Sequence, residues 1–99
     1  MAEFESLEFR TSFTVPDTLT VRQQLTFRGA AALAGGDMFV RFWTASKTII
    51  ENWESEIIPD MNNFDIDEAS DPLAADVIQW TGTLISGHIA KLGTVPKNA

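Results

Sequence analysis

The sequence predicts a mainly α-helical fold, in which three helices form one small domain and an N-terminal strand or extended arm precedes them. Three segments begin next to a residue that can cap a helix and continue with apolar residues at helical spacing: 21–33, 38–57 and 72–92. An earlier segment, 7–15, is rich in residues that favour extended backbone. Because 99 residues allow one domain, we expect these four segments to share a single core.

Residues 1–16 form the expected strand or arm. Phe13, Thr14 and Val15 favour extended backbone, and Pro16 ends the segment. A single strand is not stable by itself in water, so it must pack on the helices, pair with a hairpin partner or pair with another chain. No second strand is obvious in the sequence, which keeps pairing with another chain open.

The helix expected over 21–33 has clear start and stop signals. Thr20 and Gln23 have the spacing of a capping box, in which two side chains and two backbone amides bond reciprocally. Gly35 and Gly36 follow its end. Most residues in 29–34 are Gly or Ala, so a neighbouring helix can approach closely there.

The helix expected over 38–57 shows the strongest helical periodicity. Asp37 is suited to cap its start, and Pro59 follows its end. Its apolar positions recur at spacings of three and four residues: Phe39, Phe42, Trp43, Ile49, Ile50, Trp53 and Ile57. The last helix, over 72–92, opens with Asp71 as its cap and Pro72 in its first turn. Residues 94–99 are expected to form a short tail.

Acidic residues are concentrated in the middle of the chain. The net charge is −7, and residues 51–76 hold nine acids and no base. We expect an acidic patch at Glu54, Glu56, Asp60, Asp65, Asp67 and Glu68. Binding of nucleic acid requires clustered Lys and Arg, so this charge argues against a nucleic-acid partner.

Composition also indicates the compartment. No apolar run has the length of a membrane span, and the N-terminal residues lack the basic region of a signal peptide. The chain has no cysteine, which excludes a disulfide framework and a cysteine nucleophile. We therefore expect a soluble protein of the cytoplasm.

No catalytic or cofactor signature is present. His88 is the single histidine, and its apolar neighbours at helical spacing predict a packed or boundary position. Residues 29–36 lack the motifs of a phosphate-binding loop. The loop from Asn63 has the one-three-five acidic spacing of a calcium loop, but Glu68 stands where that loop needs glycine and Ala74 where it needs glutamate. The sequence thus predicts no enzyme, cofactor or metal site. A pair of carboxylates such as Asp65 and Asp67 still leaves catalysis by acidic side chains open.

The aromatic content suggests a surface for another protein. Three short helices cannot easily bury every ring, and exposed aromatic residues often anchor protein interfaces. The expected interface residues are Phe39, Phe42, Trp43, Trp53 and Trp80.

The order of these parts resembles small assembly proteins of tailed bacteriophages. The likeness covers roughly residues 7–96 and is carried by Val15-Pro16-Asp17 before a capped helix, by Trp43 and Trp53, and by residues 77–80 with the sequence Val-Ile-Gln-Trp. In this pattern the chain looks like a phage tail assembly chaperone or a similar small morphogenesis protein. The resemblance implies a non-enzymatic role in the host cytoplasm, where the protein shields an aggregation-prone tail protein until tail polymerisation.

Two functions follow as expectations. The first is a protein-binding or assembly protein that has protein partners and forms a homo-oligomer. The alternative is a structural subunit of a virion or other oligomeric assembly, in which the arm at 7–15 adds a strand to a neighbour. In both cases we expect neither nucleic acid nor a membrane as the partner.

Overall fold

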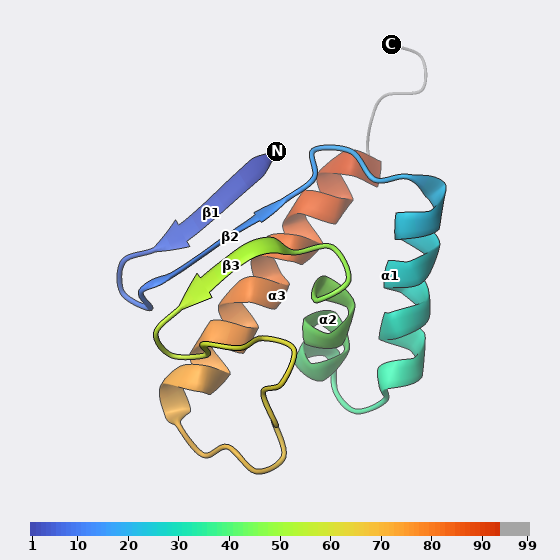
Figure 1. The fold of residues 1–99 in the computed structure, drawn as a ribbon. Coiled ribbons are helices and arrows are strands. Elements are labelled where there is room, and N and C mark those ends of the chain that lie inside the picture. The colour runs from blue at the N-terminus through green and yellow to red at the C-terminus, as the bar shows by residue number, and fades with distance from the viewer. Residues whose placement is uncertain (94–99) are drawn as a thin grey trace.

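The computed structural model describes residues 1–93 and shows an α+β fold, in which three helices lie on one side of a three-stranded antiparallel sheet (Figure 1). The elements in chain order are β1 (Ala2–Ser6), β2 (Thr11–Val15), α1 (Val21–Ala34), α2 (Met38–Ser46), β3 (Glu51–Ser55) and α3 (Pro72–Gly93). The expectation of a mainly α fold is therefore wrong. The tail expected at 94–99 lies outside the described residues.

The N-terminal arm is a hairpin, and its second strand lies at the centre of the sheet. β1 pairs with β2 in the register Ala2↔Val15 to Ser6↔Thr11, and β3 pairs with the other side of β2. Inward residues of β2 are buried, whereas those of β1 are half-buried. The sequence signal for this hairpin partner is weak, because β1 is short and three of its five residues are polar or charged.

The helix expected over 38–57 is also wrong, because α2 ends at Ser46 and the chain then turns into β3. Backbone amides of Lys47, Thr48 and Ile49 donate to carbonyls three or four residues earlier, which forms the turn. The β-branched run at 48–50 has a low helix propensity. In addition, β3 supplies hydrogen bonds to the open edge of β2, a gain that periodicity along the chain cannot reveal.

A β-bulge sets which residues of β3 face the core. Ser12 pairs with Glu54 and Thr14 with Glu51, so two residues of β3 stand opposite one residue of β2. Asn52 takes the extra position with φ 54°, and its amide nitrogen donates to Thr14 Oγ1 at 2.9 Å. Asparagine tolerates this left-handed backbone better than most residues. The bulge turns Trp53 inward and leaves Glu51 and Glu54 on the outer face.

The three helix starts agree with their sequence signals. Thr20 and Gln23 form the capping box of α1, and Asp37 Oδ1 accepts the Val40 amide at the start of α2. Asp71 Oδ1 accepts the amide of Leu73 at the start of α3. These contacts satisfy amides that have no partner inside the helix, and because they are local, the sequence is sufficient to predict them.

The core has two clusters between the sheet and the helices. The first joins the buried residues of β2 to all three helices: Phe13, Val15, Phe27, Ala45, Ile49 and Ile85. The second lies under the loop that connects β3 to α3, and it comprises Trp43, Ile58, Met61, Ala74 and Val77. Phe64 and Ile66 of that loop pack against the second cluster. The acidic loop therefore closes one end of the core.

Gly82 allows α3 to lie close to α2. A β-carbon at this position would stand 3.3 Å from Cβ of Phe42, which cannot swing away because it is attached to the backbone of α2. A β-carbon at Gly87, on the same helix, would meet no atom within 4 Å. The two glycines thus differ in their surroundings while sharing one helix.

We expect Gly82→Val to lower the free energy of unfolding by about 1–3 kcal/mol, because it overpacks the contact between α2 and α3. Gly87→Ala is the matched control and is expected to raise that free energy by about 0.5–1 kcal/mol, through helix propensity. Urea unfolding followed by circular dichroism measures both. Equal effects at the two positions would contradict the close approach at Gly82.

Candidate protein-binding surfaces

Most of the five aromatic residues expected at an interface lie in the core. Trp43 is 1% exposed, and Phe42, Trp53 and Trp80 are half-buried. Their rings join the two layers: Trp43 meets Trp53 edge to face at 5.7 Å between ring centroids, and Trp53 and Trp80 both contact the ring of Phe13. Of the five, Phe39 is exposed.

The residues of the expected acidic patch are all exposed, and they belong to two elements of the structure. Glu54 and Glu56 lie in or next to β3, whereas Asp60, Asp65, Asp67 and Glu68 lie in the loop before α3. Glu56 pairs with Arg10 across the end of the sheet, with 2.8 Å between Oε2 and Nε. Since both partners are well exposed, this ion pair adds little to stability.

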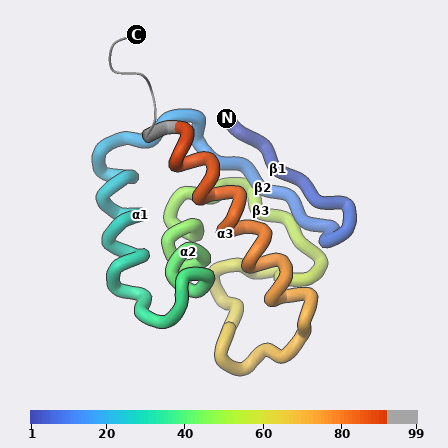
Figure 2. Tube along the Cα trace, turned by 180° about the vertical axis from the view of Figure 1, so that it is seen from behind, coloured from blue at the N-terminus to red at the C-terminus, as the bar shows by residue number. Residues whose placement is uncertain are grey.

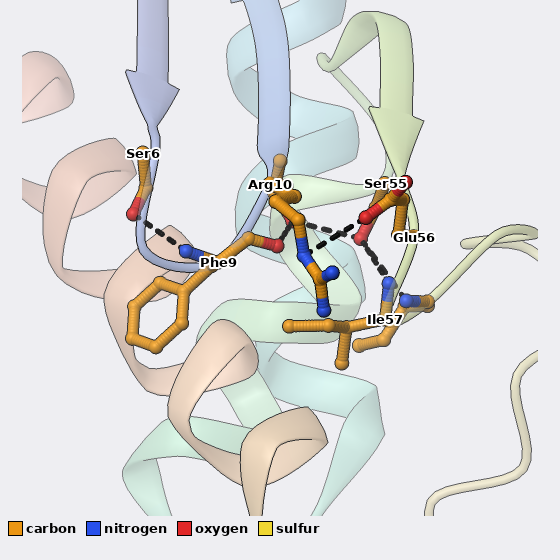
Figure 3. A network of polar contacts seen from close by, with 8 residues as sticks. Ser6, Phe9, Arg10, Ser55, Glu56 and Ile57 are labelled. Carbon is orange, nitrogen blue, oxygen red and sulfur yellow. Dashed lines mark hydrogen bonds and ion pairs between the residues drawn. The ribbon is translucent and has the colours of Figure 1, made fainter.

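Figure 3 shows the polar contacts around that ion pair. Ser6 Oγ accepts the Phe9 amide in the β1–β2 turn, and the Arg10 carbonyl accepts the Glu56 amide at 3.3 Å. Ser55 Oγ accepts the amides of Ile57 and Ile58, and it lies 2.7 Å from Thr11 Oγ1. The serine and threonine hydroxyls at this end of the sheet are therefore engaged in holding β2, β3 and the following turn together.

Two carboxylates of the acidic loop stabilise turns. Asp60 accepts the side-chain amide of Asn63 at 2.6 Å and the backbone amides of Asn62 and Asn63, and these bonds hold its pKa below the ordinary value. Asp65 Oδ1 accepts the backbone amides of Asp67 and Glu68. Within residues 1–93, no three His, Cys, Asp or Glu side chains are arranged so that they could hold a metal ion.

His88 connects α3 to the end of β2. Its Nε2 lies 2.9 Å from the carbonyl oxygen of Pro16, and its ring meets Phe4 edge to face at 6.1 Å. The side chain is half-buried, which agrees with the expected boundary position.

The outer face of the sheet carries an acidic surface that the sequence did not reveal. The strand register forms two rows across the sheet, in which β2 contributes Thr14 or Ser12 and each neighbouring strand contributes a glutamate. We name these residues the sheet face: Glu3, Glu5, Ser12, Thr14, Glu51 and Glu54. A shallow depression of about 380 Å³ lies over it. The helices pack on the opposite side, so the sheet face is open (Figures 1 and 2).

The outer side of α1 carries a surface of opposite charge. Phe27 is the buried residue of this helix, whereas Val21, Leu25 and Leu33 are 71%, 60% and 89% exposed. At about 3.6 residues per turn, Val21 and Leu25 fall on one stripe, with Arg22 and Arg28 on its two flanks. The helix contains no acidic residue. We name this group the α1 surface: Val21, Arg22, Leu25, Arg28 and Leu33.

Comparison with protein-family models, curated proteins and solved structures finds no match to this chain. Among residues 1–93, no helix is both long and apolar enough to cross a lipid bilayer. The structure offers two candidate binding surfaces, the acidic sheet face and the apolar and basic α1 surface.

Proposed function

We propose that this protein is a non-enzymatic protein-binding or assembly protein, and that the α1 surface is its principal binding site. The observation that carries the proposal is the exposure of three large apolar side chains on one helix: Val21, Leu25 and Leu33. Val21 and Leu25, four residues apart, lie on one side of α1, and apolar residues at this spacing on an exposed helix can dock against another protein. Grouped apolar exposure of this kind typically marks an interaction site.

The first residues of α2 support the same proposal. Met38 is 58% exposed and Phe39 is also exposed, and both follow α1 after a short loop. Because α1 and α2 pack against each other, these side chains extend the apolar area near the C-terminal end of α1. Of the aromatic residues expected at an interface, Phe39 thus stays a candidate. The main exposed apolar area lies on α1 instead.

The resemblance to phage tail assembly chaperones gives a narrower form of this proposal. Such a protein must offer apolar surface to an aggregation-prone partner and enough charge to keep the complex in solution. The α1 surface supplies the first property, and the net charge of −7 supplies the second. In this form the protein acts in the host cytoplasm on a tail protein.

The alternative function, a structural subunit that adds a strand to a neighbour, is favoured by one observation. β1 is an edge strand of the sheet. The segment expected to add a strand, 7–15, is not free for this purpose, because β2 is paired on both sides. The exposed Glu3 and Glu5 on β1 protect this edge from pairing with an identical strand, since like charges would meet.

A variant that removes the three exposed apolar side chains of α1 tests the proposed function. We expect Val21→Ser/Leu25→Ser/Leu33→Ser to lose partner proteins that co-purify with the native chain and are identified by mass spectrometry. A matched control is Leu7→Ser/Leu73→Ser, which changes exposed leucines outside α1. Circular dichroism must show that both variants are folded. If the native chain and the α1 variant recover the same partners, α1 is not the binding site.

A further inference from the structure

We propose that the α1 surface of one molecule binds the sheet face of a second copy in a head-to-tail arrangement. This inference rests on the proposed function, in which α1 is a binding site, and it names a second copy of the chain as its partner. The two surfaces differ in residues and shape, one being a convex helix and the other an open sheet. Their contact is therefore heterologous, and repetition of it builds a chain or a ring.

The two surfaces lie on different sides of the molecule. In both views, β1 is at one side of the fold and α1 is at the opposite side, with α2 and α3 between them (Figures 1 and 2). The sheet face points away from all three helices. One molecule can thus engage two neighbours at once, one through each surface.

Charge is complementary between the two surfaces. The sheet face has four glutamates and no base, whereas α1 has Arg22 and Arg28 and no acid. The guanidinium group of arginine binds carboxylates with paired hydrogen bonds. Contact of these surfaces brings the two arginines of α1 against glutamates of the sheet face.

The dimensions of the two charge patterns also agree. Arg22 and Arg28 are six residues apart, which is about 9 Å along a helix. The two glutamates of each row stand on β1 and β3, two strand spacings apart, or about 9.5 Å. Between them, β2 presents uncharged Ser12 or Thr14, so Leu25, midway between the arginines, would lie over the neutral middle of the sheet.

The symmetric contacts between two copies are disfavoured by charge. Antiparallel pairing of two α1 helices about Leu25 places Arg22 of each copy opposite Arg28 of the other, because both arginines are three residues from Leu25. Pairing of two β1 strands places Glu3 and Glu5 against the same residues of the copy. The head-to-tail contact is the one that pairs unlike charges.

Complementary charge reversal tests this arrangement. We expect the native chain to self-associate weakly in sedimentation velocity, with a dissociation constant of about 0.01–1 mM, since a face this small forms a transient interface. Arg22→Glu/Arg28→Glu and Glu3→Lys/Glu5→Lys should each weaken this association by about tenfold or more. An equimolar mixture of the two variants should associate again, because each retains one native surface. Added salt should weaken the native association.

The control is Asp67→Lys/Glu68→Lys, which makes the same charge change in the exposed loop before α3 and is expected to associate like the native chain or more tightly. Circular dichroism establishes that every variant is folded.

Three results would overturn the inference: a native chain that stays monomeric at about 1 mM, a Glu3→Lys/Glu5→Lys variant that associates as the native chain does, or a mixture that stays monomeric. None of these three results changes what the co-purification experiment with the Val21, Leu25 and Leu33 variant shows. That experiment therefore tests the proposed function separately.

Discussion

Replacing Trp43 by alanine is expected to lower the free energy of unfolding by about 3–5 kcal/mol, the usual cost of removing a large aromatic ring from a core. Trp43 is 1% exposed and belongs to the cluster that the loop before α3 covers. A domain of this size has a total stability of about 5–15 kcal/mol. The variant should therefore lose a large part of its stability, which urea unfolding followed by circular dichroism measures.

Two further variants of α2 sharpen this prediction. Phe39→Ala removes an exposed ring from the same helix and should cost less than about 1 kcal/mol. Trp43→Phe should cost less than Trp43→Ala, because it keeps much of the ring and removes an indole N–H that is buried with no hydrogen-bond partner in the described part of the chain. If Trp43→Ala were as mild as Phe39→Ala, Trp43 would not be a core residue.

Phe13→Ala is expected to have a similarly large effect, lowering the free energy of unfolding by about 3–5 kcal/mol. Phe13 is 1% exposed on the central strand. Its ring contacts Phe4 at 5.3 Å, Trp53 at 5.8 Å and Trp80 at 5.6 Å between centroids. One substitution therefore weakens contacts with both neighbouring strands and with α3.

This variant distinguishes a central strand from a separate N-terminal arm. The matched control is Ser12→Ala, on the outer face of the same strand, and it should change the free energy of unfolding by less than about 1 kcal/mol. An arm that does not belong to the core would leave stability unchanged in both variants. A small effect of Phe13→Ala would thus restore the arm expected from the sequence.

The helix starts could be predicted, whereas the extent of the second helix could not. Thr20, Asp37 and Asp71 act on amides two or three residues away, so the sequence contains all the information needed. Ile49, Ile50 and Trp53 fit helical spacing equally well, yet they lie in a turn and a strand. The arrangement of these residues depends on the pairing of β3 with the free edge of β2. That strand lies about 40 residues away along the chain.

For the candidate surfaces too, some features follow from the sequence and others depend on the fold. Aromatic residues were expected at an interface, but Trp43, Trp53 and Phe13 pack together across the layers, because the sheet provides a second wall for the core. Glu3 and Glu5 belonged to an expected arm, and Glu51 and Glu54 to an expected helix. The strand register is what brings the four carboxylates onto one face.

The sequence by itself determined the three helix starts and the acidic charge, because capping acts within a few residues and charge follows from composition. Tertiary structure alone decided that 51–55 is a strand, that β2 is central, and that an acidic sheet lies opposite an exposed apolar helix. The physical reason is that a strand is stabilised by hydrogen bonds and side chains on other strands. Short-range patterns in the chain do not contain those partners.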